Sequence, residues 1–182
     1  MTIYYMRHGQ SQSNANKVVT GKQESKLTSV GQHQSEHASN LIKDLNIGLI
    51  VCSPLERAKD TAKIIANQIG YPDSAIIIDP DLTERALGEL ENKSYAKNPR
   101  MNGNFPETET VKGIESLEHL HARLNHFLKD ILPQAKHKNI LIVCHMNVGR
   151  MLQIIANGQK PTEFYDTPRL ENARVHKLID VN

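Results

Sequence analysis

Three short apolar runs, each followed by a polar turn, constrain the fold of this chain more than any other feature. They are Ile3–Met6, Leu49–Cys52 and Asn139–Cys144, whose last five residues are all apolar. Unbroken apolar runs of this length are typical of strands that are buried on both faces of a parallel sheet. Helical patterns separate the runs along the chain. The alternation predicts an α/β fold, a three-layer α/β/α sandwich with a mainly parallel central sheet.

Periodicity and end signals place the other elements. Helices are expected over Ser29–Asn46, from Pro54 to Ile69, over Ile114–Gln134 and over Val148–Asn157, and further strands over Ala75–Ile78 and Ala173–Ile179. Thr28 is the expected N-cap of the first helix, whose predicted buried stripe is Val30, Ala38, Leu41, Ile42 and Leu45. Ser53 and Glu56 have the spacing of a capping box with Pro54 at the first helical position, so the second helix is expected to begin there.

Length and composition set the class of protein. The 182 residues predict a single domain over 1–182, with an irregular insertion at about 88–113 that could act as a lid. A net charge of +2 without a run of Lys and Arg gives no indication of nucleic-acid binding. The absence of a signal peptide pattern and of any apolar stretch near 18 residues predicts a cytoplasmic protein without a membrane partner. The sequence leaves monomer and homodimer both open.

Two cysteines lie inside apolar runs. Cys52 and Cys144 are each at the end of an expected strand, which favours buried, reduced thiols. A disulfide between them stays open, because spacing along the chain does not say whether the two strand ends meet.

The strongest functional signal is Arg7-His8-Gly9, directly after the first apolar run. The carboxyl ends of strands in an open α/β sheet are where ligands bind, and Gly9 would let a ligand approach the backbone there. His145 follows the last apolar run in the same way, and Arg57 falls in the first turn of a helix, where an anion is favoured. With Glu84 after the third strand, these side chains are expected to converge on one rim.

Phosphoryl transfer to an imidazole is the chemistry that uses this set of side chains. Two arginines can hold phosphate oxygens by paired hydrogen bonds, and a histidine among cations stays neutral with a ring nitrogen free to attack phosphorus. A carboxylic acid can protonate the leaving oxygen and then activate water. The arginines and the second histidine supply the charge that a metal provides in other sites, so neither a metal nor another cofactor is expected.

At this point the sequence resembles the histidine phosphatase superfamily, the phosphoglycerate mutase-like enzymes, over nearly its whole length. The matching segments are Arg7–Ser11 with Asn14, Thr20-Gly21, Leu27-Thr28 with Gly31, Ser53-Pro54-Leu55 with Arg57-Ala58 and Thr61-Ala62, Leu82 with Glu84-Arg85 and Gly88, and His145 with Asn147 and Arg150. Several segments in the right order are far more specific than any one of them. The resemblance implies an α/β/α sandwich, in agreement with the reading of the strands and helices.

The resemblance also implies roles for individual residues. His8 would be the nucleophile that becomes phosphohistidine, Glu84 the proton donor, and His145 a further catalytic residue. The phosphate pocket would comprise His145 with Arg7, Asn14, Arg57 and Met146, and the substrate-binding positions would be Gln10, Ser11, Thr20, Gly21, Leu87 and Asn147. Met146 departs from the glycine that is usual in the family; its backbone N–H can still face the phosphate, while its side chain would narrow the pocket.

The expected activity is a phosphomonoesterase acting on small phosphorylated metabolites. Mutases of the family carry an aromatic residue where this chain has Leu87, and paired arginines in a longer insertion where this chain has Lys93, Lys97 and Arg100. These departures favour the phosphatase branch. A phosphoglycerate mutase is the first alternative, and a phospho-ligand-binding module without turnover is the second.

Overall fold

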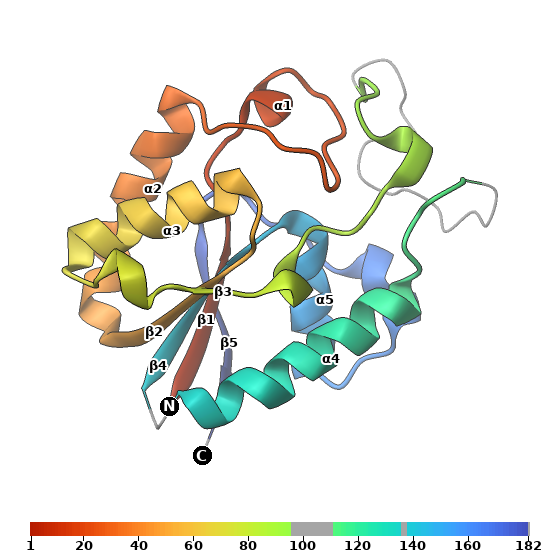
Figure 1. Ribbon diagram of the computed structural model, residues 1–182. Helices are drawn as coiled ribbons and strands as arrows, with labels where there is room; N and C mark the ends of the chain where they lie inside the picture. Colours follow the sequence, from red (N-terminus) through yellow and green to blue (C-terminus); the bar gives the residue numbers. More distant parts are fainter. Residues whose placement is uncertain (96–110, 136–137, 182) are drawn as a thin grey trace.

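The computed structural model describes residues 1–95, 111–135 and 138–181, and its centre is a five-stranded sheet in the order β3-β2-β4-β1-β5 (Figure 1). The strands are β1 Thr2–Arg7, β2 Ile47–Cys52, β3 Ile77–Ile78, β4 Asn139–Cys144 and β5 Val175–Asp180. All neighbouring pairs are parallel except β1 and β5, which are antiparallel. The expected three-layer fold with a mainly parallel sheet is confirmed.

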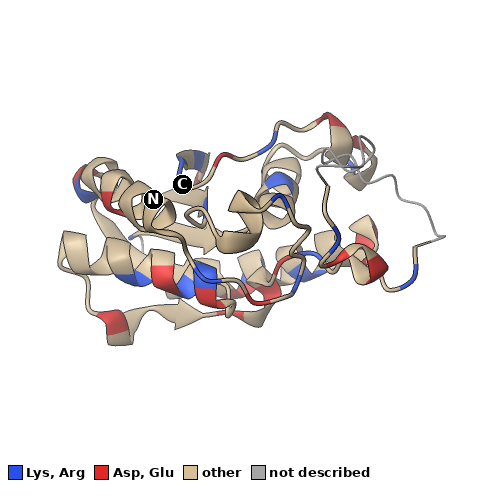
Figure 2. Cartoon of the chain, turned by 90° about the horizontal axis from the view of Figure 1, so that it is seen from above, with Lys and Arg blue, Asp and Glu red and all other residues tan. Residues whose placement is uncertain are grey.

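Helices cover both faces of the sheet (Figure 1). The α-helices are α1 Gln12–Ala15, α2 Ser29–Ile42, α3 Glu56–Ile69, α4 Leu117–Gln134 and α5 Met146–Ala156, and the 3₁₀ helices are η1 Lys43–Leu45, η2 Asp73–Ala75, η3 Pro80–Leu82, η4 Gly88–Leu90 and η6 Pro161–Asp166. Helices α2 and α3 pack on one face, while α4 and α5 pack on the other. Acidic and basic side chains are interspersed over the elements (Figure 2). None of the helices described is long and apolar enough to cross a membrane.

Alternate residues of the central strands supply two separate cores. In β4, Ile140, Ile142 and Cys144 face α4 and α5, whereas Leu141 and Val143 face α2 and α3. Cys52 belongs to the α2/α3 core and Cys144 to the opposite core, and both thiols are free and buried. The sheet therefore separates the two cysteines, and the disulfide that the sequence left open is not formed. Burial raises the pKa of the Cys52 thiol to about 12 and also raises that of Cys144, so both stay protonated.

The predicted capping box at the start of α3 is wrong. The helix begins at Glu56 rather than Pro54, and its N-cap is Leu55, which provides no side-chain cap. The Ser53 hydroxyl instead accepts a hydrogen bond from the Leu55 N–H and contacts His145 Nε2. A carboxylate from the preceding loop, that of Glu24, accepts the Glu56 N–H. Tertiary contacts have thus replaced the local cap. The predicted end of the helix is confirmed, with Gly70 in the left-handed region at φ 72°.

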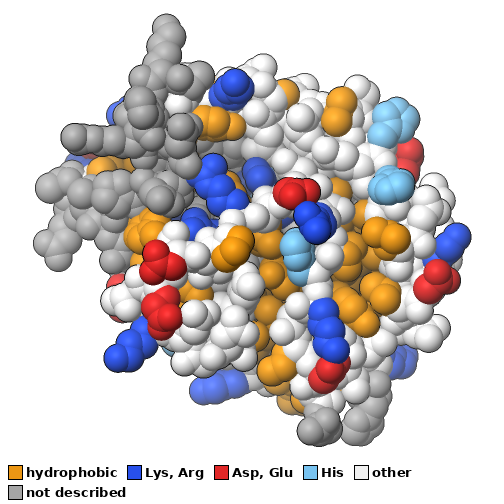
Figure 3. All heavy atoms as spheres, turned by 180° about the vertical axis from the view of Figure 1, so that it is seen from behind, with side chains coloured by type: hydrophobic (Ala, Val, Ile, Leu, Met, Phe, Trp, Pro, Cys, Tyr) orange, Lys and Arg blue, Asp and Glu red, His pale blue; other side chains and the backbone are white. Residues whose placement is uncertain are grey.

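The predicted N-cap of α2 is confirmed, but its predicted buried stripe is wrong at two positions. The Thr28 hydroxyl accepts the Gly31 N–H, whereas Val30 and Leu41 are 50% and 63% exposed. The buried face consists of Gly31, Ser35, Ala38, Ser39 and Ile42. Val30 and Leu41 line a hollow beside the segment that precedes β5. Apolar side chains gather on the rear face of the molecule (Figure 3).

Small residues form the buried face because α2 lies close to the backbone that leaves β1. A Cβ built on Gly9 would be 2.3 Å from the Gly31 carbonyl oxygen, and a Cβ on Gly31 would be 2.1 Å from the Gln10 carbonyl oxygen. Gly9 was expected to give a ligand access to the backbone. The structure gives it another role, which is to let helix α2 approach the loop that carries the site residues.

The remaining differences concern element ends. Helix α4 begins at Leu117 with Ser116 as its N-cap, three residues later than predicted, because Ile114 pairs with Leu87 in an isolated bridge. Strand β3 is shorter than predicted because Asp73–Ala75 form η2. The middle of the expected insertion, residues 96–110, lies outside the described residues.

Substituting Gly31 by alanine tests the contact between α2 and the Gln10 backbone. Alanine is favoured over glycine inside a helix by about 1 kcal/mol, so a Gly31→Ala variant without a clash would be more stable than the parent. We expect it to be less stable by about 1–3 kcal/mol, the usual range for overpacking. Urea unfolding measures the difference, with Gln32→Ala on the exposed side as the control. A Gly31→Ala variant that matches or exceeds the parent in stability would contradict the assigned contact.

Candidate active site

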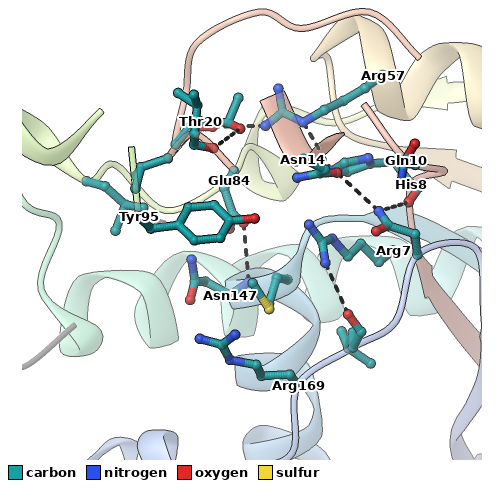
Figure 4. A pocket seen from close by; sticks show the side chains of 17 residues that line it. Arg7, His8, Gln10, Asn14, Thr20, Arg57, Glu84, Tyr95, Asn147 and Arg169 are labelled. Atoms are coloured by element: carbon teal, nitrogen blue, oxygen red, sulfur yellow. Dashed lines mark hydrogen bonds between the residues drawn. The ribbon is translucent and has the colours of Figure 1, made fainter. Parts of the chain in front are cut away.

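A cavity of about 270 Å³ opens at the edge of the sheet where the parallel strands end (Figure 4). Its lining comes from segments far apart in the sequence: Arg7, His8, Gln10, Asn14, Val18, Val19, Thr20, Gly21, Arg57, Glu84, Leu87, Tyr95, Met146, Asn147, Arg169, Leu170 and Asn172. The volume suits a small ligand. Among the described residues, the charged side chains that line it are three arginines and one glutamate, so the cavity favours an anion.

His8 is held in one tautomer by its neighbours. Its Nδ1 lies 2.7 Å from the carbonyl oxygen of Gly9. A carbonyl oxygen can only accept, so the proton is on Nδ1 and Nε2 carries a lone pair. Arg57 Nε donates to that Nε2 at 3.2 Å. Burial first, and then the charges of Arg57 and Arg7, hold the pKa of His8 well below its ordinary value of 6.5. The imidazole is neutral, with Nε2 available as a nucleophile.

Arg57 joins His8 to the loop at Gly21 and Gln23. Its Nη1 donates to the Gln23 carbonyl at 2.7 Å and its Nη2 to the Gly21 carbonyl at 2.9 Å, while Nε contacts His8. The side chain is buried, and removal from water lowers its pKa to about 10, with the charge of Glu84 opposing the shift. Arg57 therefore remains a cation at neutral pH, as the expected anion site requires.

Arg7 is the last residue of β1. Its Nη1 donates to the Leu170 carbonyl at 3.2 Å, and its Nε is buried without a hydrogen-bond partner among the described residues. Desolvation lowers the pKa of Arg7, and the nearby charge of Glu84 opposes the shift. A buried, unsatisfied N–H at a cavity wall is free to donate to a ligand.

His145 packs behind His8 and does not line the cavity. The two ring centroids are 5.2 Å apart, and the rings meet edge to face at 61°. His145 Nε2 lies 2.7 Å from the Ser53 hydroxyl, which also accepts the Leu55 N–H. Burial, followed by the charge of Arg57, holds the pKa of His145 well below 6.5, so this imidazole is neutral too. Its Nδ1 is buried and has no partner within the described part of the chain.

Glu84 follows η3 and lies across the cavity. Its Oε1 accepts the Arg85 N–H at 2.8 Å, and its Oε2 accepts the Asn147 N–H at 3.3 Å. The second contact places the carboxyl group at the N-terminus of α5, where unpaired backbone donors favour negative charge. The side chain is held on both sides and is mostly buried.

The cavity brings together most of the residues that the sequence singled out. All of them line it except His145, which touches His8, and Ser11. Ser11 is fully buried and caps α1, where its hydroxyl accepts the Asn14 N–H and Asn14 Oδ1 accepts the Ser11 N–H. Ser11 therefore caps α1 and does not line the cavity, and its expected contact with substrate stays a prediction. Met146 does line the cavity.

Sequence reasoning missed Val18, Val19, Tyr95, Arg169, Leu170 and Asn172 in the lining. Asn172 Nδ2 donates to the His8 carbonyl at 2.8 Å and to Asn14 Oδ1 at 3.3 Å. One signal could have found the segment 169–172. If the last strand is antiparallel, it starts at the edge where the parallel strands end, and the residues before it meet the site. Tyr95 follows η4 in an aperiodic stretch and gives no such signal.

Comparison with known proteins gives a consistent result. A family model described as histidine phosphatase superfamily (branch 1) matches residues 3–179. The chain is 31% identical over 171 residues to an uncharacterised phosphatase, PhoE, of Bacillus subtilis, covering 94% of this chain and 84% of that protein. It is 34% identical over 161 residues to a 2,3-bisphosphoglycerate-dependent phosphoglycerate mutase of Cytophaga hutchinsonii, covering 84% and 75%.

Solved structures show the same fold. The α-ribazole phosphatase of Shigella flexneri matches with a TM-score of 0.84 at 25% identity, covering 100% of this chain and 91% of that one. A mycobacterial glucosyl-3-phosphoglycerate phosphatase matches with a TM-score of 0.83 at 22% identity, covering 95% and 90%.

The protonation states of the site can be tested by ¹⁵N NMR of the histidine rings at pH 6.5. We expect His8 to be neutral with its proton on Nδ1, because burial and two arginines lower its pKa. Exposed His126 provides an internal control, since its hydrogen bond to Asp81 raises its pKa and keeps it mostly protonated. Unfolded imidazoles bind protons below pH 6.5 that folded His8 and His145 do not, so these two residues make the fold less stable as the pH falls. A protonated His8 at pH 6.5 would contradict the assignment.

Proposed function

The chain belongs to the histidine phosphatase superfamily, branch 1, and on that premise we propose that it is a metal-independent phosphomonoesterase that forms a phosphohistidine on His8 and hydrolyses it. The observation that carries the proposal is the neutral His8 imidazole, with its Nδ1–H on the Gly9 carbonyl and its Nε2 next to the Arg57 guanidinium. Such a nitrogen is a ready nucleophile beside a bound phosphate.

In the proposed first step, Arg7 and Arg57 hold the phosphate oxygens. When phosphate binds, the Arg57 Nε–H donates its hydrogen bond to a phosphate oxygen instead of to His8 Nε2. The lone pair on His8 Nε2 is then free. Nε2 attacks phosphorus, the N–P bond forms and the P–O bond to the alcohol breaks. Protonated Glu84 gives its proton to the leaving oxygen. The two arginines supply the positive charge that stabilises the transferring group, so no metal is required for that purpose.

In the proposed second step, the Glu84 carboxylate takes a proton from water. The water oxygen attacks phosphorus, the N–P bond breaks and inorganic phosphate leaves, which restores the lone pair on His8 Nε2 and the proton on Glu84. His145, a neutral imidazole whose Nε2 contacts the Ser53 hydroxyl, packs edge to face against His8 from behind. Both steps use groups that the structure already holds through hydrogen bonds.

A phosphoglycerate mutase is the second candidate, supported by the similarity to relatives with that name. A mutase must retain its intermediate while the phosphoryl group returns to it, which requires extra cations for the far end of the substrate and exclusion of water. Lys93 does not line the cavity, and Lys97 and Arg100 lie outside the described residues. Arg169 is a single further arginine in the lining, and one guanidinium binds a carboxylate less firmly than a pair. We therefore favour hydrolysis.

The activity itself is tested with purified protein, EDTA and a panel of small phosphomonoesters. We expect release of inorganic phosphate, and an acid-labile, base-stable phosphoryl adduct after quenching with labelled substrate. The His8→Ala variant should form no adduct and lose nearly all turnover, because it lacks the nucleophile. An acid-stable adduct or full activity of His8→Ala would overturn the mechanism, and activity that needed an added divalent ion would overturn its metal independence.

With 3-phosphoglycerate and a trace of bisphosphate, formation of 2-phosphoglycerate faster than phosphate would make the mutase the correct assignment.

The role of Glu84 is tested separately with Glu84→Gln. Loss of a general acid lowers the rate by about 10²–10⁴, and we expect a loss of that size on alkyl phosphates. Aryl phosphates have leaving groups that need little protonation, so the loss on their cleavage should be much smaller, as measured by single-turnover formation of the phosphohistidine. An equal loss on both classes would assign proton donation to another residue.

A further inference from the structure

The carboxyl group of Glu84 lies on a short backbone segment that is held from outside the cavity. Residues 81–86 run from η3 past the cavity, and helix α4 packs against η3 (Figure 1). Glu84 accepts the N–H groups of Arg85 and Asn147. The first of these donors belongs to the same segment, so the place of the carboxyl group depends on how that backbone is fixed.

The first anchor of the segment is Arg123, whose side chain reaches from α4 to Asp81. Its Nη1 donates to the Asp81 carbonyl. The same guanidinium donates to Glu115, from Nε to Oε1 at 2.7 Å and from Nη2 to Oε2 at 3.0 Å. Paired hydrogen bonds of this kind fix the orientation of a guanidinium as well as its position. The start of the segment is therefore bound to a group that has little freedom to turn.

The second anchor is Glu115, which lies just before α4 and holds the end of the segment. Its Oε2 accepts the Ala86 N–H at 3.3 Å, and its own N–H donates to the Ala86 carbonyl at 3.0 Å. Its carbonyl accepts from Arg85 Nε at 2.7 Å. Glu84 thus lies between two anchored points, and the two anchors are bound to each other.

The Glu115–Arg123 ion pair is mostly buried, with side chains that are 6% and 12% exposed. An exposed ion pair contributes little, whereas a buried two-point pair with further bonds to the backbone keeps one geometry. Neither residue lines the cavity. The pair can therefore influence the reaction only through the segment that carries Glu84 or through its charges, which have opposite signs.

We propose that Arg123 and Glu115 are positioning residues for the general acid, and that together they place the Glu84 carboxyl group against the leaving oxygen. The inference rests on the proposed phosphatase mechanism, in which Glu84 protonates that oxygen. Proton transfer needs the acid within hydrogen-bond reach, and a misplacement of about 1 Å can cost about 10²-fold in rate. Loosening the pair should slow a reaction that needs the proton and spare one that does not.

The test compares 4-nitrobenzyl phosphate with 4-nitrophenyl phosphate, which differ by a single CH₂ group. The benzyl alcohol oxygen needs a proton as it leaves, whereas nitrophenolate does not. Single-turnover formation of the phosphohistidine is measured for the parent, Arg123→Met and Glu115→Gln. We expect both variants to lose about 10- to 100-fold on the benzyl ester and less than about threefold on the phenyl ester. The ratio of the two rates within one preparation does not depend on the fraction of enzyme that is folded.

The two variants change the charge near the site in opposite directions. Arg123→Met removes a cation and Glu115→Gln removes an anion, so a purely electrostatic effect would shift the ratio of rates in opposite senses. A positioning effect lowers the benzyl rate in both. Arg123→Lys keeps the charge but lacks the planar fork, and it should recover part of the loss. If one of the variants does not fold, the other two decide.

Glu84→Gln supplies the reference for loss of the acid. Combined with Arg123→Met, it should lose no more on the benzyl ester than Glu84→Gln alone, because Arg123 acts through Glu84. Ile131→Val is the matched control. Ile131 is buried in the same helix, about two turns beyond Arg123, and the loss of a methyl group lowers stability without removing the ion pair. Its ratio of rates should equal that of the parent.

The outcomes separate this inference from the proposed function. If Arg123→Met and Glu115→Gln lose equally on both esters, or shift the ratio in opposite senses, the inference is wrong and the phosphatase stands. Losses that multiply in the double variant would also overturn it. If Glu84→Gln itself loses equally on both esters, the proposed acid is wrong and the inference falls with it. If the parent forms no phosphohistidine from either ester, the proposed function itself fails.

Discussion

The register between β1 and β4 is the constraint on which the rest of the site depends. Arg7 lies beside Cys144 in the parallel pair, and the His8 N–H donates to the Cys144 carbonyl at 3.0 Å. The two strands therefore end at the same level, and the residue after each one is a histidine. Strand β2 ends at that level as well, since the Ser53 N–H donates to the Val143 carbonyl. A shift of one residue would turn every side chain of β1 to the opposite face and separate the two imidazoles.

Backbone carbonyls hold most of the buried cations of this protein. Arg57 donates to two carbonyls of the loop at Gly21 and Gln23, Arg150 to those of Tyr165 and Thr167, and Arg7 to that of Leu170. Neutral acceptors fix a guanidinium without cancelling its charge. The site thus keeps a net positive charge that is available to an anion. Burial first, and then this charge, lowers the pKa values of His8 and His145. A carboxylate partner in the same place would have competed with a phosphate.

Long loops form the part of the cavity wall that the strand ends do not provide. The segments 18–21, 84–95 and 167–172 come from three parts of the chain and meet over the strand ends. The first two segments are tied together through Asn92, whose N–H donates to the Val19 carbonyl, and through Glu91, whose carboxylate accepts from Leu87 and from Gln23. The sheet and helices therefore position His8, and these loops shape the rest of the cavity.

The sequence alone determined the layers of the fold and the core of the site, because those depend on short-range patterns. Apolar runs mark the strands, and the polar residues that follow them identified His8, Glu84 and the surroundings of His145. Arg57 was identified by its place in the first turn of a helix. Tertiary structure decided the rest. At the start of α3, the Glu24 carboxylate accepts the Glu56 N–H. The close approach of Gly9 and Gly31 determines which face of α2 is buried. Arg169 and Tyr95 line the cavity although no sequence pattern indicated them. Each of these depends on contacts between segments far apart in the chain, and no local periodicity encodes which distant backbone a side chain will meet.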